Sequence, residues 1–551
     1  MGIPAYFSHI IKNYPNILKK FNGTELINNL YLDSNSIIYD CLRNIDFVNI
    51  NDYEDKLINA VCKKIEDYIQ QIKPTTLIYI AFDGVAPVAK MNQQKTRRYK
   101  SWFISKYNND LNKKWDSTAI TPGTDFMNKL NLQVKYHFKQ NSKYKFKKII
   151  VSGSDEAGEG EHKLFKYIRE NEKQNKNSNT VIYGLDADLI MLTINHVEYC
   201  KNIYLFRETP AFIQSIDASL DPECLYIVDI PVFSDQLNYY LNNDKEVKES
   251  YEKNRIFDYI FLCFLLGNDF LPHFPALNIR TNGIDKILDV YRKTIGNTKK
   301  NIIYNKKIVW KNVRKLIKEL AENEERYIKN EYLLRNKMEK RPIPVDNDAT
   351  KFDKEMLFAP QKQREMEKYI NPLDDYWQER YYDMLFDIEI DDEWRKEISI
   401  NYLEGLEWTY KYYTFGCVDW RWSYKYDYPP LLQDLIKYIP YFDTELIKEK
   451  EMDPVTDIVQ LCYVLPKNSL NLIPLRIKNK LLSKYGDKYK EDNEFEWAWS
   501  KYFWECHVKF EDFEVNKIEE LVGVPPPYDG GYVVGVPPPY DGGYVAAPRL
   551  F

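Results

Sequence analysis

The sequence predicts an α/β protein, in which a mostly parallel sheet is flanked by helices and a helical, aromatic-rich second region packs against it. Two observations lead to this prediction. Over residues 1–288, short apolar segments typical of buried strands alternate with longer segments of helical periodicity. From residue 372 onward the chain is instead dense in Trp and Tyr, which most often form core. Alternation of the first kind indicates a parallel sheet covered by helices.

The strands expected from this pattern are residues 29–33, 77–83, 148–152, 180–186 and 202–206. Helices are expected between them, for example over residues 57–71 and 161–171. In open sheets of this kind, ligands bind beyond the carboxyl ends of the strands. Asp33, Asp83 and Asp186 all stand at such ends. Carboxylates at three strand ends predict one acidic site.

Further acids follow the same logic. Glu159 and Glu161 lie where glycines turn the chain into a helix, and Asp269 follows an apolar segment. Asp186 and Asp188 are expected to leave a strand in extended conformation, with both side chains on one face. Each acid also has a simpler interpretation as a helix cap or a turn residue. If they all converge, they repel one another unless divalent cations neutralise them, and a site made of oxygen ligands suits Mg²⁺ or Mn²⁺.

The segment that follows the second expected strand carries cations. Pro87 suits the first turn of a helix. Four polar side chains of that helix have the spacing that places them on one face: Lys90, Gln94, Arg97 and Arg98. Such a face beside a carboxylate indicates a metal-dependent enzyme that holds a phosphate and cuts a phosphodiester. The alternative is a solvated basic helix face that follows an N-capping Asp.

Composition excludes some classes of protein. The chain has 551 residues and a net charge of −5, so it is not a nucleic-acid coat held by bulk positive charge. The eight cysteines show no C-x-x-C spacing, which indicates reduced thiols of an intracellular protein, and the six histidines show no zinc spacing. We expect no signal peptide and no membrane span.

Changes in composition divide the chain into four parts. Residues 1–288 form the α/β core with the acidic site, and residues 289–371 form a charged connector that is expected to consist of solvated helices. Residues 372–520 form the second region, in which one or two aromatic rings could face a groove and stack on a nucleobase. Residues 521–551 form a Pro/Gly/Tyr tail that repeats one segment unchanged and is expected to be disordered.

The tail suggests one kind of partner. Grooves of the WW type bind Pro-rich segments. Two stretches fit such a groove: Pro525, Pro526, Pro527 and Tyr528, and their copies Pro537, Pro538, Pro539 and Tyr540. A flexible tail without a dedicated partner is the alternative.

These residues as a set resemble the Xrn family of 5′→3′ exoribonucleases, over residues 1 to about 520. Motifs of such length in matching order are highly specific. In the first region the resemblance is carried by Leu32-Asp33-Ser34-Asn35, Phe82-Asp83-Gly84-Val85-Ala86-Pro87, Ala89-Lys90-Met91-Asn92-Gln93-Gln94, Ile120-Thr121-Pro122-Gly123-Thr124, Gly158-Glu159-Gly160-Glu161-His162-Lys163, Tyr183-Gly184-Leu185-Asp186-Ala187-Asp188-Leu189-Ile190-Met191-Leu192 and Gly267-Asn268-Asp269-Phe270-Leu271-Pro272. In the second region it is carried by Tyr402-Leu403-Glu404-Gly405-Leu406-Glu407-Trp408 and Trp420-Arg421-Trp422.

The resemblance implies a PIN/FEN-like sheet and assigns roles to named residues. Its metal-binding, catalytic acids fall on Asp33, Asp83, Glu159, Glu161, Asp186, Asp188 and Asp269. Its pocket for the 5′-monophosphate falls on Lys90, Gln94, Arg97 and Arg98. Pro87 matches a proline that helps to bar duplex from the entrance. The family stacks the leading bases between a His and a Trp; here the His position holds Tyr39, and the Trp is Trp420 or Trp422.

The implied activity is processive 5′→3′ hydrolysis of single-stranded RNA that bears a 5′-monophosphate, with release of nucleoside 5′-monophosphates. The implied cofactors are two Mg²⁺ ions, for which Mn²⁺ substitutes. We expect a cytoplasmic monomer without membrane contact. The short length and the A+T-rich coding bias favour a large DNA virus as the source, with the virion or viral factory as the location in that case.

Two alternatives belong to other classes. A flap-type structure-specific DNA nuclease shares the sheet and the acid clusters, but it usually adds a Gly-rich helical hairpin that grips duplex. A silent RNA-binding scaffold would recruit WW-domain partners through the tail, and the loss of a central acid would favour it. The sequence retains all of these acids.

Overall fold

The computed structural model describes residues 6–45, 50–109, 115–140, 144, 148–207, 220–221, 224–343, 349–511 and 513–523. Helix α24 (Val515–Val522) continues into the first residues of the expected tail. The rest of that tail, including both Pro-Pro-Pro-Tyr segments, lies outside the described residues.

A seven-stranded sheet organises the first half of the chain. Its order is β1-β7-β6-β5-β2-β3-β4. The five strands β2 to β6 run parallel to one another, whereas β7 pairs antiparallel with both β6 and β1. The strands are β1 (Leu18–Phe21), β2 (Asn29–Asp33), β3 (Leu77–Ala81), β4 (Lys148–Ser152), β5 (Asn179–Tyr183), β6 (Asn202–Phe206) and β7 (Leu225–Asp229).

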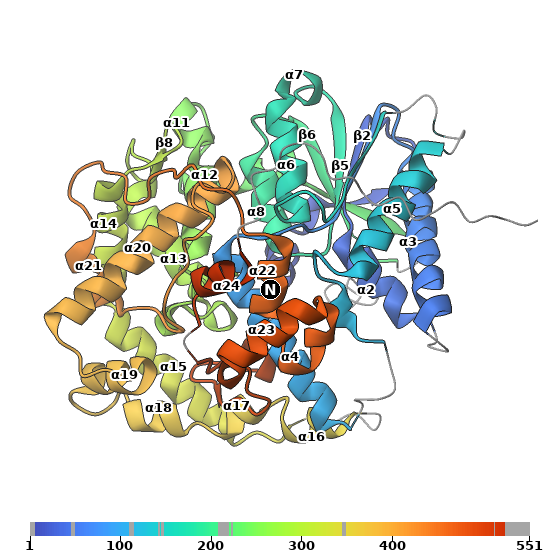
Figure 1. Ribbon diagram of the computed structural model, residues 1–551. Helices are drawn as coiled ribbons and strands as arrows, with labels where there is room; N and C mark the ends of the chain where they lie inside the picture. Colours follow the sequence, from blue (N-terminus) through green and yellow to red (C-terminus); the bar gives the residue numbers. More distant parts are fainter. Residues whose placement is uncertain are drawn as a thin grey trace, which may run out of the picture.

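Alternate residues of the central strands face two separate cores. On one face, Leu30 and Ile78 pack with helices α2 (Asn35–Arg43), α3 (Ile50–Ile72) and α5 (Asp125–Gln140). On the other face, Tyr31 and Tyr79 pack with helices that include α1 (Tyr6–Asn13), α6 (Gly160–Glu170), α8 (Asp188–Asn195), α10 (Ile230–Leu241) and α12 (Arg255–Phe264). Figure 1 shows the sheet between α3 and α5 on one side and α6 on the other. Every residue of β2 and β3 is therefore buried, on one face or the other, as expected for a parallel sheet that helices cover on both faces.

All five expected strands are present, with ends that differ by one to three residues at two of them. The expected strands over residues 77–83 and 180–186 end at Ala81 and Tyr183, so Asp83 and Asp186 lie just beyond the strands. The sequence reasoning missed β1 and β7. Strand β1 is short and contains two lysines, and both strands depend on antiparallel pairing between distant segments, for which local patterns give no signal.

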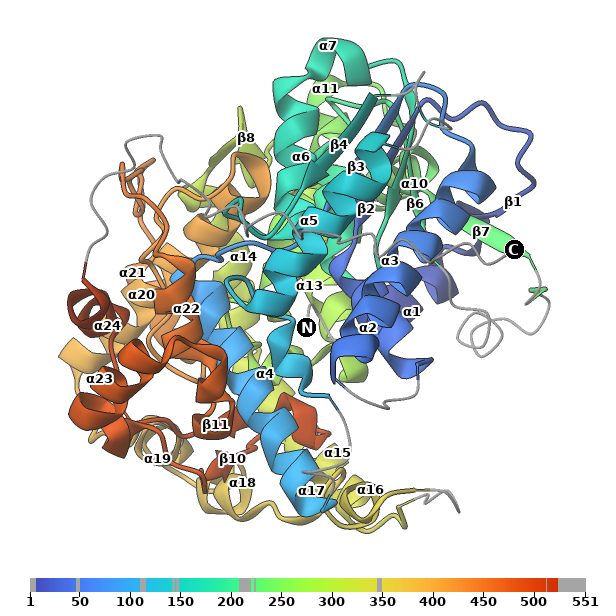
Figure 2. The ribbon, with the colours of Figure 1, turned by 45° about the vertical axis from the view of Figure 1, so that its right-hand side comes forward.

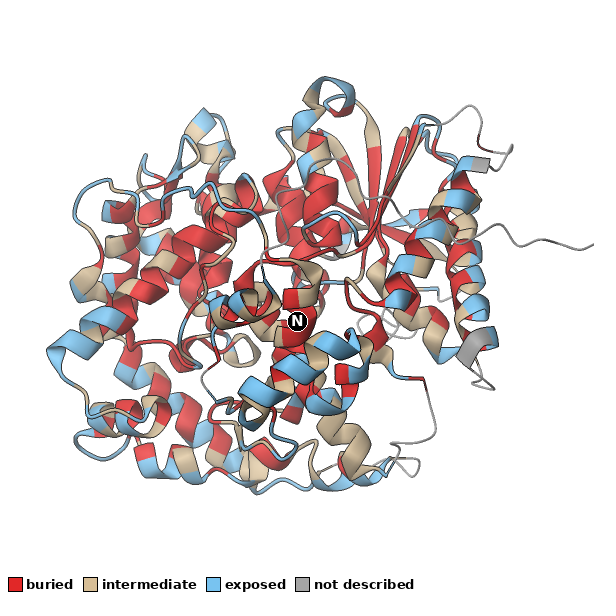
Figure 3. Ribbon diagram, viewed as in Figure 1, coloured by how far each residue is buried: buried red, intermediate tan, exposed pale blue. Residues whose placement is uncertain are grey.

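The second half of the chain is helical. The core on the α6 side of the sheet continues without a break into α20 (Asp392–Thr414), whose aromatic side chains include the fully buried Trp408. Figure 3 shows this buried stripe along α20 and the buried strands of the sheet. The expectation that most aromatic residues of this region form core is confirmed.

The remaining helices are short to medium in length. They are α7 (Glu172–Asn175), α11 (Ser250–Lys253), α13 (Gly283–Tyr291), α14 (Trp310–Glu322), α15 (Glu324–Glu339), α16 (Lys351–Glu355), α17 (Ala359–Lys362), α18 (Glu365–Ile370), α19 (Trp377–Phe386), α21 (Leu432–Tyr438), α22 (Asp457–Val464) and α23 (Leu475–Tyr485). Two small hairpins pair β8 (Ile303–Tyr304) with β9 (Lys307–Ile308), and β10 (Phe495–Glu496) with β11 (His507–Val508). Among the described residues, no helix combines the length and the apolar composition that crossing a bilayer needs.

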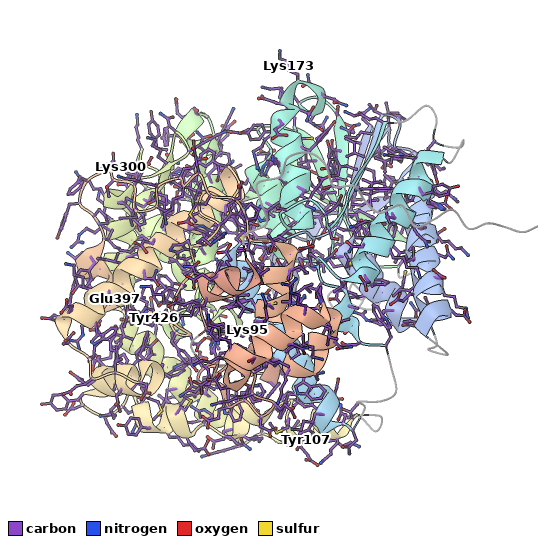
Figure 4. All side chains as sticks on the ribbon, in the orientation of Figure 1. Lys95, Tyr107, Lys173, Lys300, Glu397 and Tyr426 are labelled. Atoms are coloured by element: carbon purple, nitrogen blue, oxygen red, sulfur yellow. The ribbon has the colours of Figure 1, made fainter. Side chains whose placement is uncertain are left out.

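Helix α4 (Val88–Tyr107) joins the two halves. It follows β3 in the chain but packs against α22 and β11 of the second region, as Figure 2 shows. The ammonium of the buried Lys95 lies 4.3 Å from the ring centroid of Phe510 and 4.7 Å from that of Tyr463. Figure 4 places Lys95 at the centre of the molecule and Tyr107, at the end of the same helix, near its edge. Cation–π contacts in a desolvated setting of this kind are worth about 2 kcal/mol each.

The connector differs from the expectation of solvated helices. Three charged side chains of α15 are buried, among them Arg335 and Glu324. Arg335 forms a forked pair with the buried Glu367 of α18, at 2.6 and 2.9 Å, and Arg364 donates to the same carboxylate at 2.6 Å. The charge pattern resembled a solvated face because sequence alone does not show which charges find partners across the fold.

Candidate active site

Three carboxylates from distant segments meet at the carboxyl ends of β2 and β5. Asp33 is the last residue of β2, Asp186 follows β5, and Glu161 lies in the first turn of α6. One ligand oxygen from each lies within 4.8 Å of the others. Such a set of hard oxygen donors fits a cation of the Mg²⁺ or Mn²⁺ kind.

Two glycines allow this close approach. The Gly160 amide, at the start of α6, donates to Asp83 Oδ1 at 2.7 Å, and a Cβ on Gly160 would lie 2.5 Å from Asp33 Oδ1. The loop after β3 passes still closer to the loop after β4, since a Cβ on Gly84 would lie 1.7 Å from the Glu156 carbonyl oxygen. Larger residues would push the loops apart and separate the acids.

Lys90 lies among the acids. Its ammonium is 2.5 Å from Glu159 Oε2 and 2.6 Å from Asp269 Oδ2, and Gln93 donates to the other oxygen of Asp269 at 3.1 Å. Lys90 therefore joins α4, the start of α6 and the loop after α12 in one charged cluster. Asp188 belongs to the same cluster, since the charges of Asp269 and Asp186 act on it.

Burial and neighbouring charges shift the pKa values of several of these acids. Burial raises the pKa of Asp33 and of Glu161 well above their ordinary values, and neighbouring carboxylates add to both shifts. Burial and then Asp269 raise the pKa of Asp188 to about 7. Burial also acts to raise the pKa of Asp269, but the Lys90 ammonium outweighs it and holds that pKa below its usual range.

Three of these carboxylates each have one buried oxygen without a hydrogen-bond partner among the described residues. Within the described part of the chain, Asp33 Oδ1, Glu161 Oε2 and Asp188 Oδ1 are buried and have no hydrogen-bond partner. Unpaired buried oxygens are costly in free energy, and a divalent cation would both coordinate them and offset the mutual repulsion. The residues present therefore fit the cation that the sequence predicted.

The Asp186–Asp188 segment corrects one expectation. Ala187 has helical backbone angles, φ −68° and ψ −28°, and Asp188 is the first residue of α8. The segment is not extended, and the two carboxylates differ in environment: Asp186 is exposed, whereas Asp188 is buried. The apolar residues that follow Asp188 form a helix, and a short apolar run cannot be told from a strand by periodicity alone.

The polar face of α4 adjoins the acids. Arg98 donates to Thr121 Oγ1 at 2.8 and 3.2 Å, and the buried Gln94 accepts from Gln460 Nε2 at 3.3 Å. Arg97 is exposed and makes no hydrogen bond or ion pair with any residue that the structure describes. The face thus presents one unoccupied guanidinium beside one held in place, a suitable cradle for an anion.

The candidate stacking residues occupy different environments. Pro87 is buried immediately before α4, and the amide that follows it donates to the Trp420 carbonyl oxygen at 3.0 Å. Trp420 is half-buried, whereas Trp422 is 8% exposed and stacks on Trp408 with ring centroids 5.2 Å apart. Tyr39, on α2, is half-buried, and its phenol and the guanidinium of Arg97 interact electrostatically.

Comparison with known families agrees with this geometry. The model described as the XRN 5′-3′ exonuclease N-terminus matches residues 1–209, and that of the Xrn1 helical domain matches residues 250–372 and 360–511. Together they cover most of the chain. The chain belongs to the Xrn family.

Curated relatives carry corresponding names. The chain is 29% identical to 5′-3′ exoribonuclease 1 of Saccharomyces cerevisiae, over 86% of this chain and 40% of that protein. It is 29% identical to 5′-3′ exoribonuclease 1 of Homo sapiens, over 86% of this chain and 31% of that protein. It is 26% identical to the 5′-3′ exoribonuclease 2 homolog of Drosophila melanogaster, over 92% and 69%. The chain thus spans less than half the length of the type 1 relatives and about two thirds of the type 2 relative.

Sequence reasoning missed two residues that arrange this Xrn site. Tyr412 of α20 donates its hydroxyl to Glu159 Oε1 at 2.8 Å, and its ring stacks on His162 with centroids 3.7 Å apart. The fully buried Gln460 of α22 contacts Gln94 and also accepts from the Ala86 amide at 2.9 Å. The only signal for either was its position in the aromatic or helical second region, because Tyr412 and Glu159 are 253 residues apart in the chain.

Proposed function

We propose that the chain is a metal-dependent, processive 5′→3′ exoribonuclease that degrades single-stranded RNA with a 5′-monophosphate to nucleoside 5′-monophosphates. One observation carries the proposal. Lys90, on the basic face of α4, lies within 2.6 Å of two acids of the cluster. A terminal phosphate held on that face would place the first phosphodiester beside the carboxylates. The names of the relatives support the same activity.

Recognition of the 5′ end would fall to α4. Arg97 has a free guanidinium, and Arg98 and Gln94 are held in place by Thr121 and Gln460. Guanidinium groups bind phosphate oxygens through charge-assisted hydrogen bonds. A pocket closed around one phosphate should not accept a cap or a triphosphate.

The acids would hold the metal. Asp33, Glu161 and Asp186 have the geometry of a common ligand set, and Asp83, Glu159, Asp188 and Asp269 surround them. Two Mg²⁺ ions, with Mn²⁺ as an alternative, would supply an activated water and stabilise the leaving 3′-oxygen. The protein's own part is to fix the carboxylates and to exclude competing ligands.

The leading base would stack between Tyr39 and Trp420. Of the two candidate tryptophans, Trp420 is half-buried beside Pro87, whereas Trp422 is packed into the core against Trp408. Stacking on an aromatic ring is worth about 1–3 kcal/mol per base. Tyr39 provides that stacking without titrating near neutral pH, as a His would. Pro87, before α4, would help to bar duplex from the entrance.

The test uses matched RNAs that differ only in the 5′ end, each digested with and without EDTA. Hydrolysis should require the metal and should favour 5′-monophosphate over 5′-hydroxyl and 5′-triphosphate RNA. Asp186→Asn with Asp188→Asn should abolish hydrolysis in a folded protein, and Arg97→Ala should reduce the preference for the monophosphate. Turnover by the double variant would remove these acids from the chemistry. A digestion of flap DNA in parallel tests the flap-nuclease alternative.

The wider setting follows the same proposal. We take the chain as a monomer that acts in the cytoplasm, and the coding bias as that of a large DNA virus. The Pro-Pro-Pro-Tyr segments of the tail would bind a WW-type domain. A pull-down on WW domains with Tyr528→Ala and Tyr540→Ala tests this contact, and equal capture of the wild type and the double variant would refute it.

A further inference from the structure

A cavity of about 800 Å³ lies beside α4, and among the described residues its lining does not include Tyr39, Pro87 or Trp420 of the candidate entrance. Its walls come from α4, from residues 266–280 and 421–428, and from parts of 498–516. Of the described residues that line it, Asp269 alone belongs to the seven acids and Arg97 alone to the basic face. The cavity therefore adjoins the acidic site without being the entrance beside Trp420.

The lining combines residues of the candidate site with residues at the protein surface. Asp269 and Arg97 belong to the candidate site. The other walls of the cavity include Lys425, Trp504 and Glu511, all of which are exposed. Its volume falls within the range of about 300–1,000 Å³ that holds ligands of drug size. A nucleoside monophosphate would fit within it.

A processive exonuclease needs such a second opening. After each cleavage the shortened strand still occupies the entrance, while the product lies at the phosphate face. We propose that this cavity is the exit route of the nucleoside 5′-monophosphate product. The proposal rests on the proposed function, because it assumes that mononucleotides are released while the strand stays bound.

The charged residues that line the cavity favour release of a nucleotide over its retention. Arg97 offers the product phosphate a guanidinium that has no ion pair with any described residue, at the part of the lining that belongs to the basic face. Two other cations of the lining are engaged: Lys100 donates to the Trp504 carbonyl oxygen at 2.9 Å, and Arg280 pairs with Glu505 at 2.5 Å. A nucleotide that leaves Arg97 would meet no second free phosphate trap among these cations. Weak attraction beyond the first contact allows release.

The outer rim is acidic, which favours one direction of travel. Asp427, Glu511 and Glu514 line the cavity and are exposed, whereas Lys425 is the one exposed cation among the described lining residues apart from Arg97 of the basic face. Like charges disfavour the approach of a polyanion, so an RNA strand would be kept from entering at this end. A mononucleotide carries far less charge and would cross the rim into solvent.

The test separates the first cleavage from later ones. Removal of the first nucleotide needs no earlier exit, whereas each later removal does. Ser423→Trp fills the half-buried wall, and Asn516→Trp narrows the exposed rim. Ser483→Trp, on the exposed surface of α23 and away from the cavity, is the matched control. Rapid-quench digestion of a 5′-monophosphorylated RNA, with enzyme in excess, resolves the successive cleavages.

Both cavity variants should keep the first-cleavage rate of the wild type and slow each later cleavage, on the order of tenfold for Ser423→Trp, because product release becomes rate-limiting. The control should match the wild type throughout. If Ser423→Trp does not fold, the rim variant carries the test with the same expectation at a smaller factor.

Later cleavages at the wild-type rate in the folded variants would overturn the exit route, and so would equal slowing of first and later cleavages. Failure of the proposed function looks different. In that case the wild-type protein itself would not remove the first nucleotide from the monophosphorylated RNA.

Discussion

Replacing Tyr412 by Phe removes one buried hydroxyl and keeps the ring. That hydroxyl donates to Glu159 Oε1 at 2.8 Å, and the carboxylate is only 4% exposed. The ring would stay in its stack, with centroids 3.7 Å from His162 and 4.8 Å from Trp408. A hydrogen bond to a charged group contributes about 1.5–3 kcal/mol, so the free energy of unfolding should fall by about that amount in metal-free protein.

The same loss should affect activity. Without the hydroxyl, Lys90 would be the one remaining side-chain partner of the Glu159 carboxylate among the residues that the structure describes. If the whole contribution served to orient the carboxylate in the transition state, turnover would fall by about ten- to a hundredfold, since 1.4 kcal/mol corresponds to tenfold. We expect a drop within this limit and a higher Mg²⁺ concentration at half-maximal rate.

The assay is a Mg²⁺ titration of RNA hydrolysis, together with denaturant unfolding in EDTA. Tyr381→Phe is the matched control. Tyr381 lies in α19, and its buried hydroxyl donates to a neutral acceptor, the Pro429 carbonyl oxygen, at 2.9 Å. The control should lose about 0.5–1.5 kcal/mol of stability and no activity at any Mg²⁺ concentration. An unchanged rate and metal dependence of Tyr412→Phe would refute the positioning role.

Three further perturbations have signs fixed by the structure. Burial lowers the pKa of His196 to about 3, so between that pH and about 6.5 the unfolded chain binds more protons, and stability should fall as pH falls through this window, less so in His196→Gln. Glu367→Gln removes the anion that two buried guanidinium groups share, leaving Arg364 with Glu339, and should cost about 3–5 kcal/mol, whereas Glu325→Gln, in an exposed pair, should cost below about 1 kcal/mol. Gly160→Ala should keep the fold but displace the Asp33 carboxylate and reduce hydrolysis on the order of tenfold or more.

Each of these has its own check. Denaturant unfolding at several pH values measures the first, and identical pH profiles of wild type and variant would contradict it. Unfolding at neutral pH measures the second, and equal costs of the two substitutions would show that burial does not matter. For the third, Gly486→Ala is the control, because a Cβ there has no neighbour within 4 Å; full activity of Gly160→Ala would mean that the acids tolerate the displacement.

The sequence was informative where the chemistry is local. Asp33 ends β2 and Asp186 follows β5, and the sheet brings these strand ends together, so their approach was predictable; the charge of Asp83, after β3, also acts on Asp33. The shared face of Lys90 and Arg97 follows from helical spacing. The antiparallel β1 and β7 gave no local signal, because their pairing joins segments about 200 residues apart. The helical start at Asp188 was missed for a different reason, since its apolar run suits either structure.

Contacts across the two halves escaped sequence reasoning for a physical reason. Patterns report which side of an element is apolar, not what lies against it. The donation of Tyr412 to Glu159, and the support of Gln94 by Gln460, arise only when α20 and α22 pack on the sheet domain. The buried Arg335–Glu367 pair is the same kind of case: each charge alone predicted solvent exposure.

The two sides of helix α4 depend on different halves of the chain. Under the proposed function, its polar side contacts the 5′ end of the RNA. Its other side packs on the second region, where Phe510 and Tyr463 contact Lys95. Chimeras that join an amino-terminal half from one relative to a carboxy-terminal half from another should therefore misplace this helix unless its enclosure is transplanted as well. Because Gln460 of α22 contacts Gln94 of α4, we expect substitutions on α22 to change which 5′ ends of RNA the protein prefers.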